Sequence, residues 1–174
     1  MITKDNTTMV MELFFKHPDE KFHLRYLERL TGLSLPGVRK IVNKLRKEGL
    51  LESKKENVVL NYYATRNEKF NMLKKCYNIY SLQSSGLLDF LRKRYEEPEA
   101  IVLFGSYGKG EDISGSDVDI AVITTKRISV DILIFEKRLE RKITIHEISL
   151  KKAEKEFLNT LVNGIVLYGY LKVL

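Results

Sequence analysis

The sequence predicts an α/β (α+β) protein in two parts, and three observations support this prediction. In residues 1–65, an amphipathic basic stretch bounded by turn residues precedes two extended runs. Residues 66–97 lack proline and carry apolar side chains at helical spacing. From Pro98 onward, apolar runs of strand length alternate with amphipathic stretches, which predicts a small mixed sheet with helices. We therefore expect a first domain at 1–65, a helical connector at 66–97 and a second domain at 98–174.

Two short helices are expected first. Apolar residues at helical spacing between residues 10 and 14 predict a helix capped by Thr7 or Thr8 that ends before His17-Pro18. After an extended segment at 21–24, residues 25–31 predict a second helix with Leu27 and Leu30 facing inward. Gly32 then forces a turn.

The third helix is amphipathic and basic. Ser34 can cap it, and we expect it to run to about Glu48, where Gly49 stops it. Its expected buried stripe consists of Leu35, Val38, Ile41, Val42 and Leu45. Its other side carries Arg39, Lys40, Asn43, Lys44, Arg46 and Lys47. Two extended runs at 50–52 and 58–63, joined by a polar turn at 54–57, then predict a hairpin.

The connector should form two helices that break at 83–86. The expected inward stripe of the first helix is Phe70, Leu73, Tyr77 and Tyr80. That of the second is Leu87, Leu88, Leu91 and Tyr95. These helices either cover the sheet or form the contact of a homodimer.

In the second domain, strands are expected at 101–104, 118–123 and 142–148. A loop rich in glycine separates the first two strands. Ser129 can cap a helix to about Arg141, with Ile132, Leu133, Phe135 and Leu139 facing inward. A last amphipathic helix at 150–163 ends at Gly164, and a short apolar segment follows at 165–171.

The chemistry is expected where the first strand ends and the second begins. Gly105 lets the backbone approach a phosphate, and Ser106 offers an N–H and a hydroxyl as donors. Asp117 and Asp119 are two residues apart on a strand, so their side chains point the same way. Two carboxylates on one face suit a hard cation such as Mg²⁺ when a phosphate supplies the remaining ligands. The alternative is an aspartate-rich turn without function.

Ten residues separate Ser106 from Asp117, so the motif reads Gly-Ser-x10-Asp-x-Asp. This pattern resembles the nucleotidyltransferases of the polymerase β superfamily, particularly minimal ones, including antitoxins that AMPylate a HEPN-type toxin. The resemblance implies a polymerase β-like domain that uses ATP or another nucleoside triphosphate with Mg²⁺ or Mn²⁺. By it, the metal ligands and catalytic carboxylates are Asp117 and Asp119. The nucleotide-binding residues are Gly105, Ser106, Lys109 and Ser116.

The family usually adds a third carboxylate from the neighbouring strand, and this sequence departs from that pattern. In the run 142–148, strict alternation places Thr144 and His146 on one face and Glu147 on the other. The third position is therefore Thr144 or His146. His146 is the candidate ligand or base, and its alternative role is that of a passive hydrogen-bonding residue.

The order helix, short helix, turn, basic helix and hairpin resembles a winged helix-turn-helix across residues 1–65. This resemblance implies that the third helix enters the major groove of double-stranded DNA and that the hairpin contacts its backbone. Arg39, Lys40 and Asn43 are then the candidates for base contacts. Lys44, Lys54 and Lys55 are the candidates for phosphate contacts. Winged helices also serve as protein-docking modules, and a basic helix face can simply be solvated.

Charge and composition agree with these expectations. The net charge of +7 comes from residues 1–97, since 98–174 hold 11 basic and 11 acidic residues. The single Cys76 excludes an internal disulfide and suits a reducing cytoplasm. No apolar stretch reaches membrane-spanning length, so we expect a soluble cytoplasmic protein without a membrane partner.

The sequence thus predicts a nucleotidyltransferase that transfers a nucleoside monophosphate to a hydroxyl on a partner, with a DNA-binding winged helix. Because the catalytic part has no evident acceptor pocket, we expect a partner to supply the acceptor, and the resemblance implies a HEPN-type toxin or another protein for this role. The competing hypothesis is a DNA-binding regulator whose second domain only binds nucleotide or mediates assembly. A third is an antitoxin that acts by binding alone.

Overall fold

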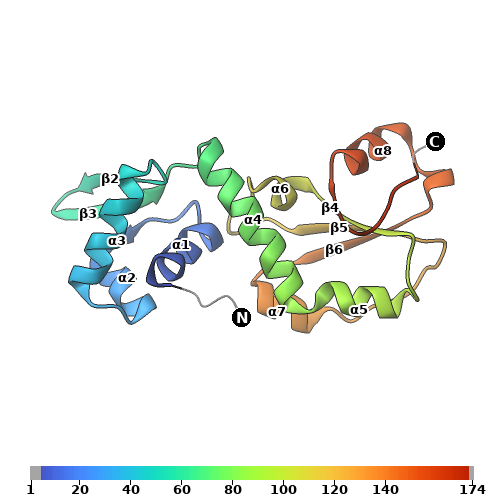
Figure 1. Cartoon of the computed structure of the whole chain (residues 1–174), viewed down its shortest axis with the longest axis horizontal. Helices are drawn as coiled ribbons and strands as arrows, with labels where there is room; N and C mark the ends of the chain where they lie inside the picture. The colour runs from blue at the N-terminus through green and yellow to red at the C-terminus, as the bar shows by residue number, and fades with distance from the viewer. Residues whose placement is uncertain (1–4, 173–174) are drawn as a thin grey trace. The chain divides into compact units, whose positions relative to one another are not determined.

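The computed structural model describes residues 5–172. The chain divides into two compact units, residues 1–72 and 73–174, and each is described by itself (Figure 1). No helix within residues 5–172 is both long enough and apolar enough to cross a membrane.

The N-terminal unit combines helices with a small antiparallel sheet. The helices are α1 (Asn6–Lys16), α2 (Leu24–Thr31) and α3 (Leu35–Lys47). The strands are β1 (Phe22–His23), β2 (Leu51–Glu56) and β3 (Val59–Ala64), in the order β1-β3-β2. Its core is formed by apolar side chains from every helix and from the sheet, among them Phe14, Phe22, Leu27, Val38, Val42, Leu45 and Tyr62.

Three expectations for this unit need correction. The cap of α1 is Asp5, whose carboxylate accepts from the Thr8 N–H at 2.7 Å, because it stands one residue before the helix while Thr7 and Thr8 lie inside it. Leu30 is 45% exposed, since the short helix α2 buries only Leu27. The hairpin turn is shorter than expected, because Glu56 pairs with Val59 and leaves only residues 57 and 58 between the strands. Lys54 and Lys55 therefore lie on β2.

The C-terminal unit contains a four-stranded sheet. Helix α4 (Glu68–Ser85) crosses the division between the units, and α5 (Leu87–Arg94) follows after a break at Gly86. The strands are β4 (Ala100–Phe104), β5 (Val118–Ile123), β6 (Ile143–Ile148) and β7 (Ile165–Gly169). The further helical elements are α6 (Gly105–Lys109), α7 (Leu133–Leu139), a 3-10 turn η1 (Leu150–Lys152) and α8 (Lys155–Val162). The strand order is β6-β5-β4-β7, and only the β5–β6 pair is parallel.

Each face of this sheet has its own core. One core joins alternate strand residues such as Ile101, Val118 and Ile120 to apolar side chains of α4, α5 and α7. The other joins Ala100, Val102, Phe104, Ala121 and Ile123 to Leu161 of α8. Figure 1 accordingly shows α5 and α7 on one side of the strands and α8 on the other. The side chains of Asp119 and His146 belong to the α8 side, since they alternate with residues of the first core.

The structure corrects the stripe expected on α4. Its buried residues include Lys74 and Asn78 at 1% exposure each, whereas Leu73 and Tyr80 are 41% and 45% exposed. Asp112 and the Tyr107 carbonyl, which bind Lys74 and Asn78, account for this orientation of the helix. The second expected stripe is confirmed, because Leu87, Leu88, Leu91 and Tyr95 are all buried.

The helices after β5 are shorter than expected. Helix α7 begins at Leu133 and not at Ser129, and Leu133 is 61% exposed. Ile128, Val130 and Ile132 instead pack at alternate positions onto the core, so this segment follows a period of two. The expected helix at 150–163 is divided into η1 and α8, with Ala153 and Glu154 extended between them.

Candidate active site

The turn after β4 requires glycine. All five residues of β4 are buried, and the chain then reverses at Gly105, whose φ is +73°. A Cβ on Gly105 would lie 2.5 Å from Oδ2 of Asp119, so the turn and this carboxylate are in direct contact. The residues after the turn form the short helix α6, whereas a loop was expected.

The two aspartates are placed by the start of β5. Val118 is buried, Asp117 precedes the strand and is exposed, and Asp119 is half-buried. Asp119 pairs with Phe104 on one side and with Thr144 on the other. The expected strand bounds at 118–123 are confirmed. Asp117 therefore comes directly before Val118, the first residue of the strand, and Asp119 directly after it.

The register of β6 decides which of its side chains face Asp119. Nε2 of His146 lies 3.7 Å from Oδ1 of Asp119, which is ion-pair range but longer than a hydrogen bond. Glu147 points to the other face, where it accepts from the Tyr95 hydroxyl at 2.9 Å and from the Ile128 N–H at 2.8 Å. The predicted alternation is therefore confirmed, and no bulge brings Glu147 toward the aspartates.

Aromatic rings hold the imidazole of His146. Its ring centroid is 5.2 Å from that of Phe104 and 6.0 Å from that of Phe157, and those two rings are 5.6 Å apart. Nε2 is shielded from solvent and has no hydrogen-bond partner within the described residues, although the side chain as a whole is 34% exposed. The ring is thus fixed with one polar atom directed at the Asp119 carboxylate.

The two aspartates suit a metal ion that takes some of its ligands from the protein and the others from a bound substrate. Within residues 5–172, no group of three or more His, Cys, Asp or Glu residues could hold a metal. Two carboxylates, Asp117 and Asp119, are still enough for Mg²⁺, because this ion is often bound by one or two carboxylates together with phosphate oxygens.

The other predicted nucleotide-binding residues lie on the segment between the turn and the aspartates. Ser106 is half-buried in α6, and Lys109 is exposed at the end of that helix. The hydroxyl oxygen of Ser116 accepts from the Ile113 N–H at 3.0 Å, so it closes a turn just before Asp117. A hydroxyl that accepts in this way can still donate its proton to a ligand.

A buried ionic network that sequence reasoning missed anchors this segment. Nζ of Lys74 lies 2.6 Å from both carboxylate oxygens of Asp112. Nδ2 of Asn78 donates to Asp112 at 2.8 Å and to the carbonyl of Tyr107 at 2.9 Å. Arg141 adds a fourth polar group, 3.9 Å from Asp112. Lys74 and Asn78 of α4 therefore hold the segment between Ser106 and Asp117 at two points, Tyr107 and Asp112.

The comparison with protein families agrees with this geometry. The model of the family described as Polymerase beta, Nucleotidyltransferase matches residues 87–171. Residues 87–171 form a polymerase β-type nucleotidyltransferase domain. The matched part begins at α5, so it includes the second helix of the expected connector. A comparison with curated proteins found no match.

The nucleotidyltransferase domain thus contains every predicted catalytic and nucleotide-binding residue. The family typically uses Mg²⁺ and a nucleoside triphosphate, which agrees with Asp119 beside the Gly105 turn and Asp117 just before β5. The roles of Gly105, Ser106, Lys109, Ser116 and His146 remain predictions, and so does metal binding by the aspartates.

The N-terminal unit carries the predicted DNA-binding residues on its surface. The Ser34 hydroxyl accepts from the Gly37 N–H at 3.4 Å and caps α3, as expected. Burial of Val38, Val42 and Leu45 orients the helix. The exposed residues of α3 and β2 include Arg39, Lys40, Asn43, Lys44, Lys54 and Lys55. The structure therefore places all six at the surface of this unit, while their role in DNA binding stays a prediction.

Proposed function

We propose that the C-terminal unit transfers a nucleoside monophosphate from ATP or another nucleoside triphosphate to a hydroxyl group of a partner. The observation that carries this proposal is the contact between the Gly105 turn and Asp119 within a nucleotidyltransferase domain. A phosphate held at the turn would lie beside a carboxylate able to share a cation with it. Asp117 would complete the pair.

The reaction consists of one in-line displacement. The acceptor oxygen attacks the α-phosphorus, the bond from that phosphorus to the bridging oxygen breaks, and pyrophosphate leaves. Gly105 and Ser106 hold the triphosphate, with Lys109 and Ser116 nearby. A Mg²⁺ ion held by Asp117 and Asp119 would neutralise charge that develops on the phosphates.

His146 is the proposed base. Nε2 faces Asp119 at 3.7 Å, and the partly exposed ring leaves Nδ1 as the nitrogen able to meet an acceptor hydroxyl. An adjacent carboxylate can orient an imidazole for proton transfer. The acceptor itself belongs to the partner, for which a HEPN-type toxin is the proposed example.

Label transfer from α-labelled ATP to a HEPN-type protein tests this proposal. We expect transfer by the wild type, its loss in Asp117→Asn plus Asp119→Asn, and a strong reduction in His146→Ala. Glu147→Gln is the matched control, because Glu147 faces the Tyr95 side of the sheet. Loss of transfer in Glu147→Gln with His146→Ala unaffected would refute the assignment of the base.

A second candidate function is that of a regulator whose nucleotidyltransferase domain binds nucleotide or partner without catalysis. It is favoured by the side chain next to Asp119 on β6, which is Thr144 and not a carboxylate. An enzyme without a third oxygen ligand lacks support for a second metal ion. Under this hypothesis the wild type transfers no label, Thr144→Asp gains activity, and Mg²⁺-dependent ATP binding by calorimetry persists in both.

We further propose that the N-terminal unit is a winged helix that binds double-stranded DNA. Support comes from the exposed basic side chains of α3 and from Lys54 and Lys55 on the strand that follows. The alternative is a protein-docking role, which is favoured by the apolar tip of the hairpin, where Val58 is 90% exposed. The salt dependence of duplex binding, treated below, distinguishes the two.

A further inference from the structure

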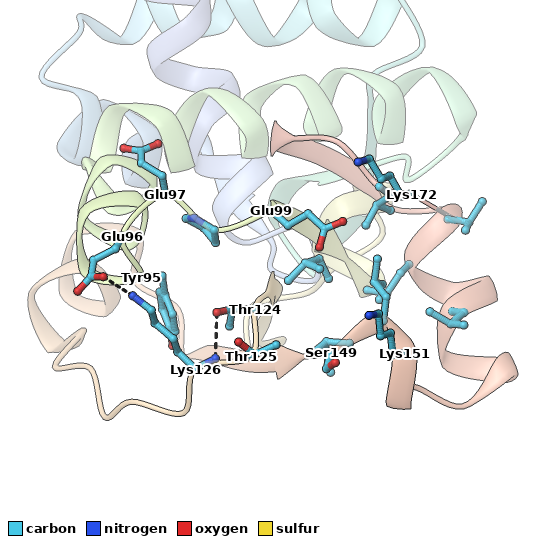
Figure 2. Close-up of a pocket in the computed structure, with 18 residues that line it drawn as sticks. Tyr95, Glu96, Glu97, Glu99, Thr124, Thr125, Lys126, Ser149, Lys151 and Lys172 are labelled. Carbon is cyan, nitrogen blue, oxygen red and sulfur yellow. Dashed lines mark hydrogen bonds and ion pairs between the residues drawn. The ribbon is translucent and has the colours of Figure 1, made fainter. Parts of the chain in front are cut away.

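A cavity of about 770 Å³ opens at the end of the C-terminal sheet opposite the Gly105 turn (Figure 2). Phe104 pairs with Asp119 at one end of the β4–β5 ladder, and Ala100 pairs with Ile123 at the other. The cavity is lined at this second end by the last residues of β5 and β6 and by residues just before β4. None of the proposed catalytic residues lines it. Its volume lies within the range of small-molecule sites, roughly 300–1,000 Å³.

One part of the lining is apolar. It includes side chains from the ends of the strands, from α8 and from the segment after β7, among them Ile123, Ile148, Leu158, Leu161, Val162 and Leu171. Leu161 is 1% exposed and belongs to the core, whereas Val162 is 52% exposed. Covering exposed apolar surface of this kind is favourable, because it removes that surface from water. The apolar part therefore favours a ligand with an apolar body.

The other part of the lining is charged, and its carboxylates are mostly neutralised. Glu96 forms an ion pair with Lys126, which Figure 2 shows on one side of the cavity. Glu97 accepts from Arg92 at 3.1 Å, and the Tyr168 hydroxyl also donates to it. These contacts lower the pKa of Glu96 through Lys126, and that of Glu97 through Tyr168 and Arg92.

Two lysines on the other side of the cavity remain without such a partner. Within residues 5–172, neither Lys151 nor Lys172 forms an ion pair, although Lys172 lies 5.4 Å from the ring of Tyr170. Figure 2 shows both lysines on the side opposite the Glu96–Lys126 pair. Among the described lining residues, Glu99 is the carboxylate that forms no ion pair. Two cations against one carboxylate, next to an apolar wall, favour an anionic ligand.

We propose that this cavity binds a small organic anion with an apolar body, such as an alkyl carboxylate or an alkyl phosphate. The apolar body lies against Leu158 and Val162 of α8, and the anionic group lies at Lys151 and Lys172. Lys151 and Lys172 are both exposed, so they are accessible to an anionic group, which both cations would attract. The site is distinct from the proposed nucleotide site, because it occupies the opposite end of the strands.

Two fluorescent probes that differ by one sulfonate group test the proposal on the full chain. The anion is 8-anilinonaphthalene-1-sulfonate, and the neutral counterpart is N-phenyl-1-naphthylamine. We expect one site for the anion, weakened about tenfold in Lys151→Gln plus Lys172→Gln, which corresponds to about 1.4 kcal/mol. The neutral probe should change less than twofold in this variant. Leu158→Asp should weaken both probes, and Lys155→Gln, an exposed lysine of α8 outside the lining, should weaken neither.

Competition identifies the head group and the site. Decanoate and decyl phosphate distinguish a carboxylate from a phosphate, and displacement by at least one of them supports the proposal, whereas 1-decanol should displace little of the anionic probe. Thermal unfolding of each variant shows that it is folded. The proposal would be overturned if the double lysine substitution left binding of the anionic probe unchanged, or if the probe bound at several equivalent sites. It would also be overturned if neither acid displaced the probe, or if Mg²⁺ and ATP displaced it fully.

Discussion

Lys44 and Lys74 are both helical lysines with an acidic neighbour, one in each unit of the chain, and they have opposite environments. Lys44 of α3 lies 3.9 Å from Glu48, with side chains that are 62% and 41% exposed. Lys74 of α4 lies 2.6 Å from Asp112, with side chains that are 1% and 0% exposed. The same residue type is available to a partner in the first case and is sealed inside the protein in the second.

The difference shows that a lysine has different effects at an exposed site and at a buried site. An exposed pair is screened by water and contributes roughly 0–1 kcal/mol, so Lys44 is held only loosely and can exchange Glu48 for a phosphate. A buried pair has lost its hydration, and removal of one partner leaves an uncompensated charge. The network of Lys74 therefore fixes structure around the Gly105 turn, whereas the surface of α3 offers charge for binding.

The largest expected effect comes from breaking the buried pair. Lys74→Met should destabilise the protein by about 3–5 kcal/mol, because Asp112 would remain buried without its cation. Urea or thermal unfolding measures the change. Lys75→Met is the matched control, since Lys75 is exposed on the same helix and should change stability by about 0.5 kcal/mol or less. A loss below about 1 kcal/mol in Lys74→Met would contradict the structural role of the pair.

A smaller effect should follow from changing the turn that this network positions. Gly105→Ala should destabilise the protein by about 1–3 kcal/mol, because the φ of +73° is strained for alanine and its Cβ would meet Asp119. Calorimetry should also show weaker Mg²⁺-dependent ATP binding. Gly115→Ala is the control, since no atom lies within 4 Å of its Cβ position. Equal behaviour of the two variants would remove Gly105 from the proposed site.

The exposed lysine should matter for DNA alone. Lys44→Gln should leave stability within about 0.5 kcal/mol of the wild type but lower the slope of log affinity against log salt by about 0.9. Fluorescence anisotropy of a labelled duplex at several salt concentrations measures the slope. Lys137→Gln, an exposed lysine of α7, should leave it unchanged. If Lys44, Lys54 and Lys55 substitutions all fail to alter affinity or slope, the N-terminal unit is a docking module.

The smallest expected effect concerns Glu56, a half-buried carboxylate in the same unit. Glu56 accepts from Lys21 at 2.6 Å, from Asn61 at 3.0 Å and from Tyr63 at 2.8 Å. The hydrogen bond from Lys21, with a smaller contribution from that of Tyr63, holds the pKa of Glu56 below its usual value of 4.5. The stability gained is therefore complete above that pH and is lost as pH falls through the lower folded-state pKa.

Thermal unfolding of wild type and Glu56→Gln between pH 7 and pH 3 measures this contribution. The two melting temperatures should differ slightly at neutral pH and converge in acid, because protonated Glu56 resembles glutamine. A difference that stays constant below pH 4.5 would show that the carboxylate charge is not responsible.

Local patterns were enough to predict β4, β5 and β6, whereas β7 was expected only as a short apolar segment. The bounds of β5 and the alternation of Thr144, His146 and Glu147 followed from period two, because one face of each strand must be apolar to pack. The motif of Gly105, Ser106 and the aspartates was visible for the same reason, since strand ends are marked by polar and turn residues.

Helix orientation was predicted less well, because it depends on partners distant in sequence. Lys74 and Asn78 can be buried on α4 because Asp112 and the Tyr107 carbonyl accept hydrogen bonds from them. Nothing near α4 in the sequence indicates these partners. The exposed side of α4 then carries Leu73 and Tyr80, which a hydrophobic stripe alone would place inside. Tertiary hydrogen bonds outweighed the local apolar pattern here.

By itself, the sequence determined the class of the protein, the order of its main elements and the residue types available for phosphate and metal chemistry, because periodicity, glycine and proline act locally. Only the tertiary structure decided which charges are sealed and which are free, how Asp119 meets the Gly105 turn, and where the lysine-lined cavity opens. Those features depend on strand register and on contacts between segments that are distant in sequence. The environment of a side chain is set by the residues that pack against it and not by its own identity.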